Sequence, residues 1–96
     1  MHVGVCKVSL RLPENATLKG KRQILKSVIA RIANKFSVSI AEVDGNDLWQ
    51  RAELGISFVS NDSRHANEVL CRVMDFIVES RLDVEVLDYE IEILTV

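Results

Sequence analysis

The chain has few of the residues that build metal centres, aromatic stacking sites and membrane spans. Its 96 residues include two Cys, one Pro, one Trp, one Tyr and three Phe. Cys6 and Cys71 stand alone, with no Cys-x-x-Cys or Cys/His cluster, so we expect no zinc site, iron–sulfur centre or other cofactor. No apolar run approaches the roughly 18 residues of a membrane span, and no signal peptide opens the chain. These absences predict a cytoplasmic protein with reduced thiols.

What the chain has is apolar content and a polarised charge. Hydrophobic residues make up 48% of the sequence, enough for one core, so residues 1–96 are expected to form a single domain. Residues 1–48 carry eight Lys or Arg against four Asp or Glu, whereas residues 49–96 carry four against ten. Although the net charge is −2, residues 1–48 are therefore basic and could attract a polyanion.

Hydrophobic periodicity predicts six elements in the order βαββαβ. Alternating apolar residues indicate strands at 2–12, 37–43, 52–60 and 84–94, and apolar residues at helical spacing indicate helices at 17–35 and 63–80. Thr17 is the expected N-cap of the first helix. This order is typical of a ferredoxin-like α/β (α+β) sandwich, in which two helices cover one face of a four-stranded antiparallel sheet.

Alternation also predicts which face each side chain of the last strand takes. The apolar residues expected to face the helices are Leu87, Tyr89, Ile91 and Ile93. The acids of that strand are expected on the outer face, opposite Lys7 and Arg11 of the first strand. Apolar residues are expected to make the outer face partly hydrophobic and able to dimerise. These residues are Val3, Val5, Val59, Val86 and Leu94.

The first helix carries cations and no acid. Its apolar stripe is Ile24, Leu25, Val28, Ile29, Ile32 and Phe36, and its cations are interpreted as lying outside that stripe. The candidate anion-binding cations are Lys19, Lys21, Arg22 and Lys26. The alternative is a solvated helix face attracted to the protein's own acidic half.

Three segments resemble a known family. They read LKGKR at 18–22, FSVSIAEVD at 36–44 and DLWQRA at 47–52. In this they are similar to the YlxP-like family of small uncharacterised bacterial proteins, a domain of unknown function. The resemblance implies a ferredoxin-like fold and, because genes of the family often lie among those for translation initiation and ribosome maturation, a connection to RNA or the ribosome. It implies no catalytic residue.

Gly20 departs from the family pattern, which usually has Glu at this position of a capping box. We expect this Gly to weaken the helix start by about 1 kcal/mol and to remove a charge that would compete with an anion. Lys19, Lys21 and Arg22, with free N–H groups near Gly20, are the predicted anion site. Restoring Glu at position 20 should then weaken anion binding and stabilise the fold.

The segment around Trp49 is the second candidate surface. A Trp and an Arg between a polar loop and a strand can form an interaction hot spot, so Trp49 and Arg51 could extend the basic surface. The alternative is that Trp49 packs on the sheet edge or core. Glu42, Asp44 and Asp47 do not follow the spacing of a calcium loop and are interpreted as turn residues.

These observations favour a non-catalytic accessory protein that binds RNA or the ribosome through the first helix. Lys19, Lys21, Arg22 and Lys26 would contact phosphates, and Trp49 and Arg51 would extend the contact. The alternative is a homo-oligomeric interaction module or a small-ligand module that uses the outer face of the sheet. No residues in the sequence form a catalytic constellation, and no membrane partner is expected.

Overall fold

The element order of the protein is β-α-β-β-α-β, as the periodicity predicts. The structure, a computed structural model, describes residues 1–80 and 83–96. Its elements are β1 (His2–Arg11), α1 (Leu18–Phe36), β2 (Ser39–Asp44), β3 (Arg51–Ser60), α2 (Ser63–Glu79) and β4 (Glu85–Thr95). Their ends differ from the predicted ones by two residues or fewer.

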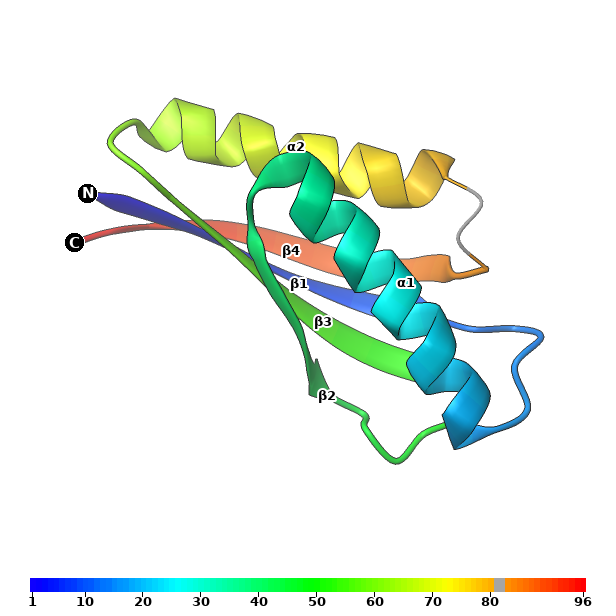
Figure 1. Ribbon diagram of the computed structural model, residues 1–96. Helices are drawn as coiled ribbons and strands as arrows, with labels where there is room; N and C mark the ends of the chain where they lie inside the picture. The colour runs from blue at the N-terminus through cyan, green and yellow to red at the C-terminus, as the bar shows by residue number, and fades with distance from the viewer. Residues whose placement is uncertain (81–82) are drawn as a thin grey trace.

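The four strands form one antiparallel sheet in the order β2-β3-β1-β4. Both helices lie on the same side of this sheet (Figure 1), with α2 packed on β1, β3 and β4, and α1 packed on β2 and α2. The order places the first and last strands side by side, so the two termini meet at one end of the sheet (Figure 1). This arrangement confirms the ferredoxin-like α+β sandwich.

Local side-chain contacts explain where the helices begin and end. Thr17 caps α1, as predicted, because its Oγ1 accepts a hydrogen bond from the N–H of Gly20 at 2.9 Å. Asp62 caps α2 through the N–H groups of Arg64 and His65. Ser37 adopts a left-handed conformation with φ of 52° and thereby ends α1.

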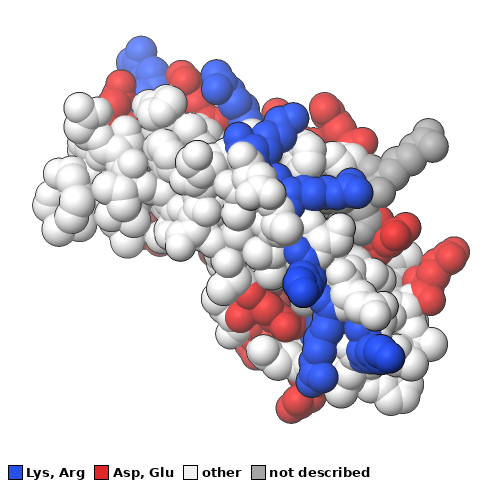
Figure 2. Space-filling view, viewed as in Figure 1, with Lys and Arg blue, Asp and Glu red and all other residues white. Residues whose placement is uncertain are grey.

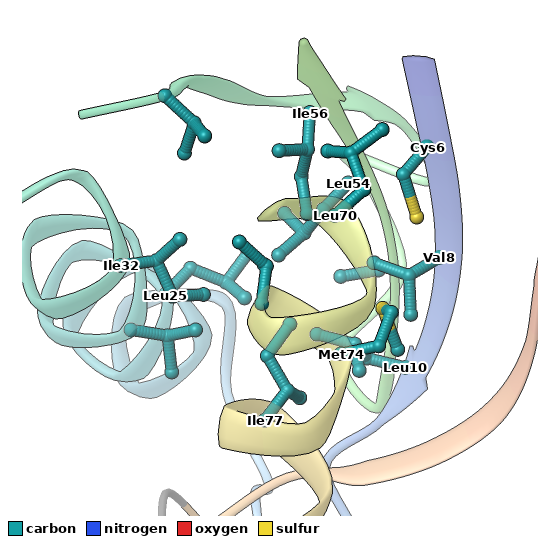
Figure 3. Close-up of a cluster of buried hydrophobic side chains, with 14 of the residues drawn as sticks. Cys6, Val8, Leu10, Leu25, Ile32, Leu54, Ile56, Leu70, Met74 and Ile77 are labelled. Carbon is teal, nitrogen blue, oxygen red and sulfur yellow. The ribbon is translucent and has the colours of Figure 1, made fainter. Parts of the chain in front are cut away.

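The core fills the space between the sheet and the two helices. Figure 3 shows side chains from β1, β3, α1 and α2 meeting there. The labelled members are Cys6, Val8, Leu10, Leu25, Ile32, Leu54, Ile56, Leu70, Met74 and Ile77, all 4% exposed or less. Alternation along β1 and β3 therefore places one side of each strand in the core, as the sequence predicts.

The prediction for β4 is wrong at the start of the strand, where Val86 and Leu87 exchange their predicted faces. The register between β1 and β4 shifts between Ser9 and Leu10, so that Leu10 pairs with Val86. Val86 therefore packs against the core, and Leu87, predicted to be inward, is 41% exposed. A bulge inserts one extra residue in the strand and reverses the alternation beyond it, which periodicity alone does not reveal.

The open face of the sheet carries charges of both signs. Lys7 lies opposite Glu90 and Arg11 lies opposite Glu85, which confirms the predicted pairing of the first strand with the acids of the last. Arg11 Nη1 is 3.9 Å from Glu85 Oε2, and both side chains are about half exposed. A pair this long and this exposed contributes little to stability.

Neither helix in the described part of the chain combines the length and the continuous apolar character that crossing a bilayer requires.

Candidate functional site

The exposed surface of α1 is basic along its length. Lys19, Arg22 and Lys26 are exposed, as are Arg31 and Lys35. Figure 2 shows blue side chains along the line of α1 down to its first turn. Within residues 1–80 and 83–96, no carboxylate oxygen lies within 4.0 Å of the ammonium or guanidinium groups of Lys19, Arg22 or Lys26. Three of the four predicted helix cations are therefore accessible to a ligand.

Lys21, the fourth predicted cation, is buried, and its assignment as a phosphate contact is wrong. Its exposed fraction is 1%, and its Nζ lies 2.8 Å from Glu42 Oε2 and donates a hydrogen bond to the carbonyl of Gly45 at 2.6 Å. The sequence contained the signal, because Lys21 precedes Leu25 and Val28 by four and seven residues and shares their buried stripe.

The ion pair of Lys21 and Glu42 joins α1 to β2. Glu42 faces the helices, because it pairs across the sheet with the buried Leu54. Its buried Oε2 forms no well-aligned hydrogen bond within the described residues, so the ammonium of Lys21 at 2.8 Å is its compensation. A buried carboxylate without such a partner is strongly destabilising. Lys21 therefore holds the helix start against the turn after β2.

Asn15 fastens a second segment to the start of α1. This buried side chain donates from Nδ2 to the carbonyls of both Thr17, at 2.7 Å, and Trp49, at 2.6 Å. Gln50 Nε2 in turn donates to the carbonyl of Asn15 at 3.0 Å, and the N–H of Leu12 donates to the carbonyl of Gln50 at 2.8 Å. Two segments more than 30 residues apart in sequence are thus locked side by side. Sequence reasoning missed Asn15, which belongs to no motif.

Gly20 is needed for this lock. A Cβ at position 20 would collide with Asn15 Oδ1 and closely approach Thr17 Oγ1. This close approach opposes the expectation that Glu at position 20 stabilises the fold, because a side chain there would push against Asn15, whose Nδ2 makes two hydrogen bonds. The predicted anion site also loses two donors, since the N–H of Gly20 is bound to Thr17 and the ammonium of Lys21 to Glu42.

The locked loop presents an exposed indole beside the basic helix. Trp49 is 58% exposed and Leu48 is 52% exposed, so the alternative that Trp49 packs into the sheet edge or core is wrong. Together with Asp47, Gln50 and Arg51 they line a hollow of about 420 Å³. Arg51 is exposed. The hydrogen bonds of Asn15 therefore bring the two predicted segments, the α1 start and residues 48–51, next to each other.

Of the three acids interpreted as turn residues, Asp44 serves the turn and Glu42 does not. Asp44 Oδ1 accepts a hydrogen bond from the N–H of Gly45 at 2.8 Å. The turn interpretation of Glu42 is wrong, because Glu42 lies within β2 and forms an ion pair with Lys21. The described residues contain no group of three or more His, Cys, Asp or Glu that could hold a metal ion.

The two thiols differ in environment. Cys6 is buried in the core and Cys71 is exposed. Burial, and to a lesser extent the nearby Cys71, raises the pKa of Cys6 from 9.0 to about 11. Cys6 is consequently a protonated, unreactive thiol near neutral pH.

The fold and the surface define a small ferredoxin-like α+β domain with an exposed basic flank on α1 and an exposed Trp49 on the loop tied to the start of that helix. Residues 3–91 match the family described as Protein of unknown function (DUF503), and the chain belongs to that family. This confirms the resemblance read from the three sequence segments.

Two individual comparisons accompany the family match. The chain is 37% identical over 75 residues to the "Uncharacterized protein YlxP" of Bacillus subtilis (strain 168), covering 78% of this chain and 82% of that one. A solved structure of LarC2, the C-terminal domain of a cyclometallase involved in the synthesis of the NPN cofactor of lactate racemase, aligns with a TM-score of 0.48 and 8% identity. That alignment covers 98% of this chain and 55% of the LarC2 chain.

Proposed function

We propose that the protein is a non-catalytic cytoplasmic accessory protein that binds RNA, free or within the ribosome. Lys19, Arg22 and Lys26 contact phosphates, and Trp49 and Arg51 extend the contact to an unpaired base. The proposal differs from the sequence-based prediction in leaving out Lys21, whose charge is neutralised inside the fold.

The observation that carries the proposal is the exposed Trp49 on a loop that buried polar contacts tie to the start of the basic helix. A Trp on a loose loop could fold back onto apolar surface. The loop of Trp49 is instead anchored by two hydrogen bonds to Asn15, one through the Trp49 carbonyl and one through the Gln50 side chain. An exposed indole on an anchored loop is a platform on which a base can stack, and such stacking is worth about 1–3 kcal/mol per base.

The cation spacing supports a phosphate backbone as the ligand. Lys19, Arg22 and Lys26 follow one another at three and four residues and so occupy one flank of α1. Like charges at this spacing repel in isolation, and a polyanion relieves that repulsion. Contact with about three phosphates of a single strand predicts a slope of roughly −2 in log affinity against log salt concentration.

A titration of labelled single-stranded RNA at two salt concentrations tests the proposal. The variant K19E/R22E reverses two charges on the proposed surface, and R64E/R72E reverses two exposed charges on α2, so both proteins have the same net charge. We expect K19E/R22E to lose more than about tenfold in affinity and R64E/R72E to change less than about twofold.

Fluorescence supplies an independent readout, because Trp49 is the only Trp in the chain. RNA should quench its emission and polyglutamate should not, since only a base stacks on the indole. Salt-sensitive co-sedimentation with ribosomal particles would extend the result to the ribosome. Absence of RNA binding at low salt, or equal losses in the two charge-reversal variants, would contradict the proposal.

A further inference from the structure

The open face of the sheet, on the side away from the helices, is hollow at its centre. Small residues occupy the middle of this face, because Ala41 of β2 and Gly55 of β3 pair across the sheet with Lys7 of β1. The resulting groove has a volume of about 460 Å³ and is bounded by Val5 and, on β4, by Glu90. This groove belongs to no part of the RNA surface proposed above.

A buried carboxylate oxygen beside the groove has no hydrogen-bond partner. Glu53 accepts a hydrogen bond from Ser9 through Oε1 at 2.6 Å, while its Oε2 is buried and unpaired within the part of the chain that the structure describes. Lys7 is exposed and has no carboxylate oxygen within 4.0 Å among the same residues. The face therefore holds an unpaired acceptor and an unpaired cation two residues apart along the sheet.

Apolar side chains form a row across one end of the same face. Val3 pairs with Val59 on one side and with Leu94 on the other. Val59 is 60% exposed and Leu94 is 43% exposed. The opposite end carries Arg11 and Arg51, so the face is apolar at one end and charged at the other.

We propose that this face binds a second copy of the chain, with a two-fold axis that runs parallel to the strands between β3 and β1. The rotation keeps each residue at its own height along the strands, so the apolar row of each copy covers that of the other. An axis across the strands would instead set the apolar row against Arg11 and Arg51.

The same rotation brings Lys7 near an acid of the other copy. It places β1 of the second copy over β3, and therefore Lys7 of the second copy over Gly55, beside the Val43 side chain that covers this glycine. Glu53 lies two residues along β3 from Gly55, so the ammonium comes to lie near its carboxylate. The acids of β4 lie over β2 of the second copy, whose outward residues Ser39, Ala41 and Val43 carry no charge.

The available area suits a stable dimer. The four strands, of 10, 6, 10 and 11 residues, lie about 4.8 Å apart and rise about 3.3 Å per residue, so they cover roughly 590 Å². Each copy would bury about this area, which gives a total of about 1,200 Å², at the lower end of the usual range of about 1,200–2,000 Å² for specific interfaces.

Sedimentation equilibrium from about 1 to about 500 µM tests the arrangement through position 41. Ala41 is exposed on an edge strand and would face Glu90 of the second copy. Wild type should reach the mass of two 10.8 kDa chains. We expect Ala41→Glu to weaken the dimer more than about tenfold, because it sets two carboxylates against each other. Ala41→Lys should leave the dimer intact and A41E/E90K should restore it, because both place opposite charges at this contact.

A second matched pair of variants tests whether the dimer forms through the open face of the sheet or through the helices. Val59→Lys on the open face should dissociate the dimer, whereas Val78→Lys on α2, at a similar exposure of 62%, should not. Circular dichroism verifies that every variant is folded. A wild type that stays monomeric at all concentrations, a mass above two chains, or equal behaviour of Ala41→Glu and Ala41→Lys would overturn the proposal.

Discussion

The two faces of the sheet are built from the same four strands, but they differ in whether their charged side chains have partners. On the helix-covered face, the charged side chain of Glu42 is matched by Lys21 within an otherwise apolar core. On the open face, Lys7 and Glu90 border a groove that contains Ala41 and Gly55, and Glu53 lies in a polar hollow with Ser9. The comparison shows that burial against helices demands a partner for every charge, whereas the open face leaves groups available for a ligand or a second copy.

The largest expected effect comes from removing Lys21, the one buried cation among residues 1–80 and 83–96. Lys21→Met should lower the free energy of unfolding by about 3–5 kcal/mol, because it leaves the carboxylate of Glu42 buried without a counterion. The matched control, Lys26→Met on the exposed side of the same helix, should change it by less than about 0.5 kcal/mol. Chemical denaturation measures both. Equal losses of stability in the two variants would contradict the distinction between buried and exposed cations.

The double variant K21M/E42L sharpens this result. Replacing both members of a buried ion pair by apolar residues is often neutral, so we expect it to recover most of the stability lost by Lys21→Met. A double variant as unstable as the single one would show that the side chains act through packing and not through charge.

An intermediate effect is expected at Gly20, where Ala normally stabilises a helix by about 0.5–1 kcal/mol. Here Gly20→Ala should destabilise the fold by about 1 kcal/mol, because the new methyl group displaces Asn15 from its two hydrogen bonds. Acrylamide quenching should also detect a looser loop at Trp49. In an Asn15→Ala background the same substitution should become stabilising; if it stays destabilising there, the collision with Asn15 is not the cause.

The smallest effect is expected for the exposed ion pair on the open face. Arg11→Ala breaks the contact with Glu85, which is 3.9 Å long and about half exposed on both sides. The free energy of unfolding of this variant should differ from that of wild type by less than about 1 kcal/mol, and the difference should be smaller still at high salt. Thermal denaturation at two salt concentrations measures this, and a loss similar to that of Lys21→Met would contradict the comparison.

Much of the fold was predictable because its signals are local. The alternation in β1 and β3, the cap at Thr17 and the helical stripes depend on residues a few positions apart, and all are confirmed. The bulge that exchanges the roles of Val86 and Leu87 was not predictable in this way, because it is a property of the pairing with β1.

The candidate surface was predictable only in part. Lys19, Arg22 and Lys26 follow from helix periodicity, and the exposure of Trp49 and Arg51 follows from the loop that the structure shows. Lys21 was misassigned because its charge was taken as a sign of exposure, although its spacing to Leu25 placed it on the buried stripe.

The sequence by itself determined the element order, the Thr17 cap and the basic flank of α1, because each depends on contacts within a turn or a strand. The tertiary structure alone decided which charges remain accessible and which segments form one surface. Lys21 meets Gly45 at a separation of 24 residues, and Asn15 meets Trp49 at a separation of 34. Such contacts exist only once the sheet has brought β2 and β3 beside the start of α1, so no local pattern can encode them.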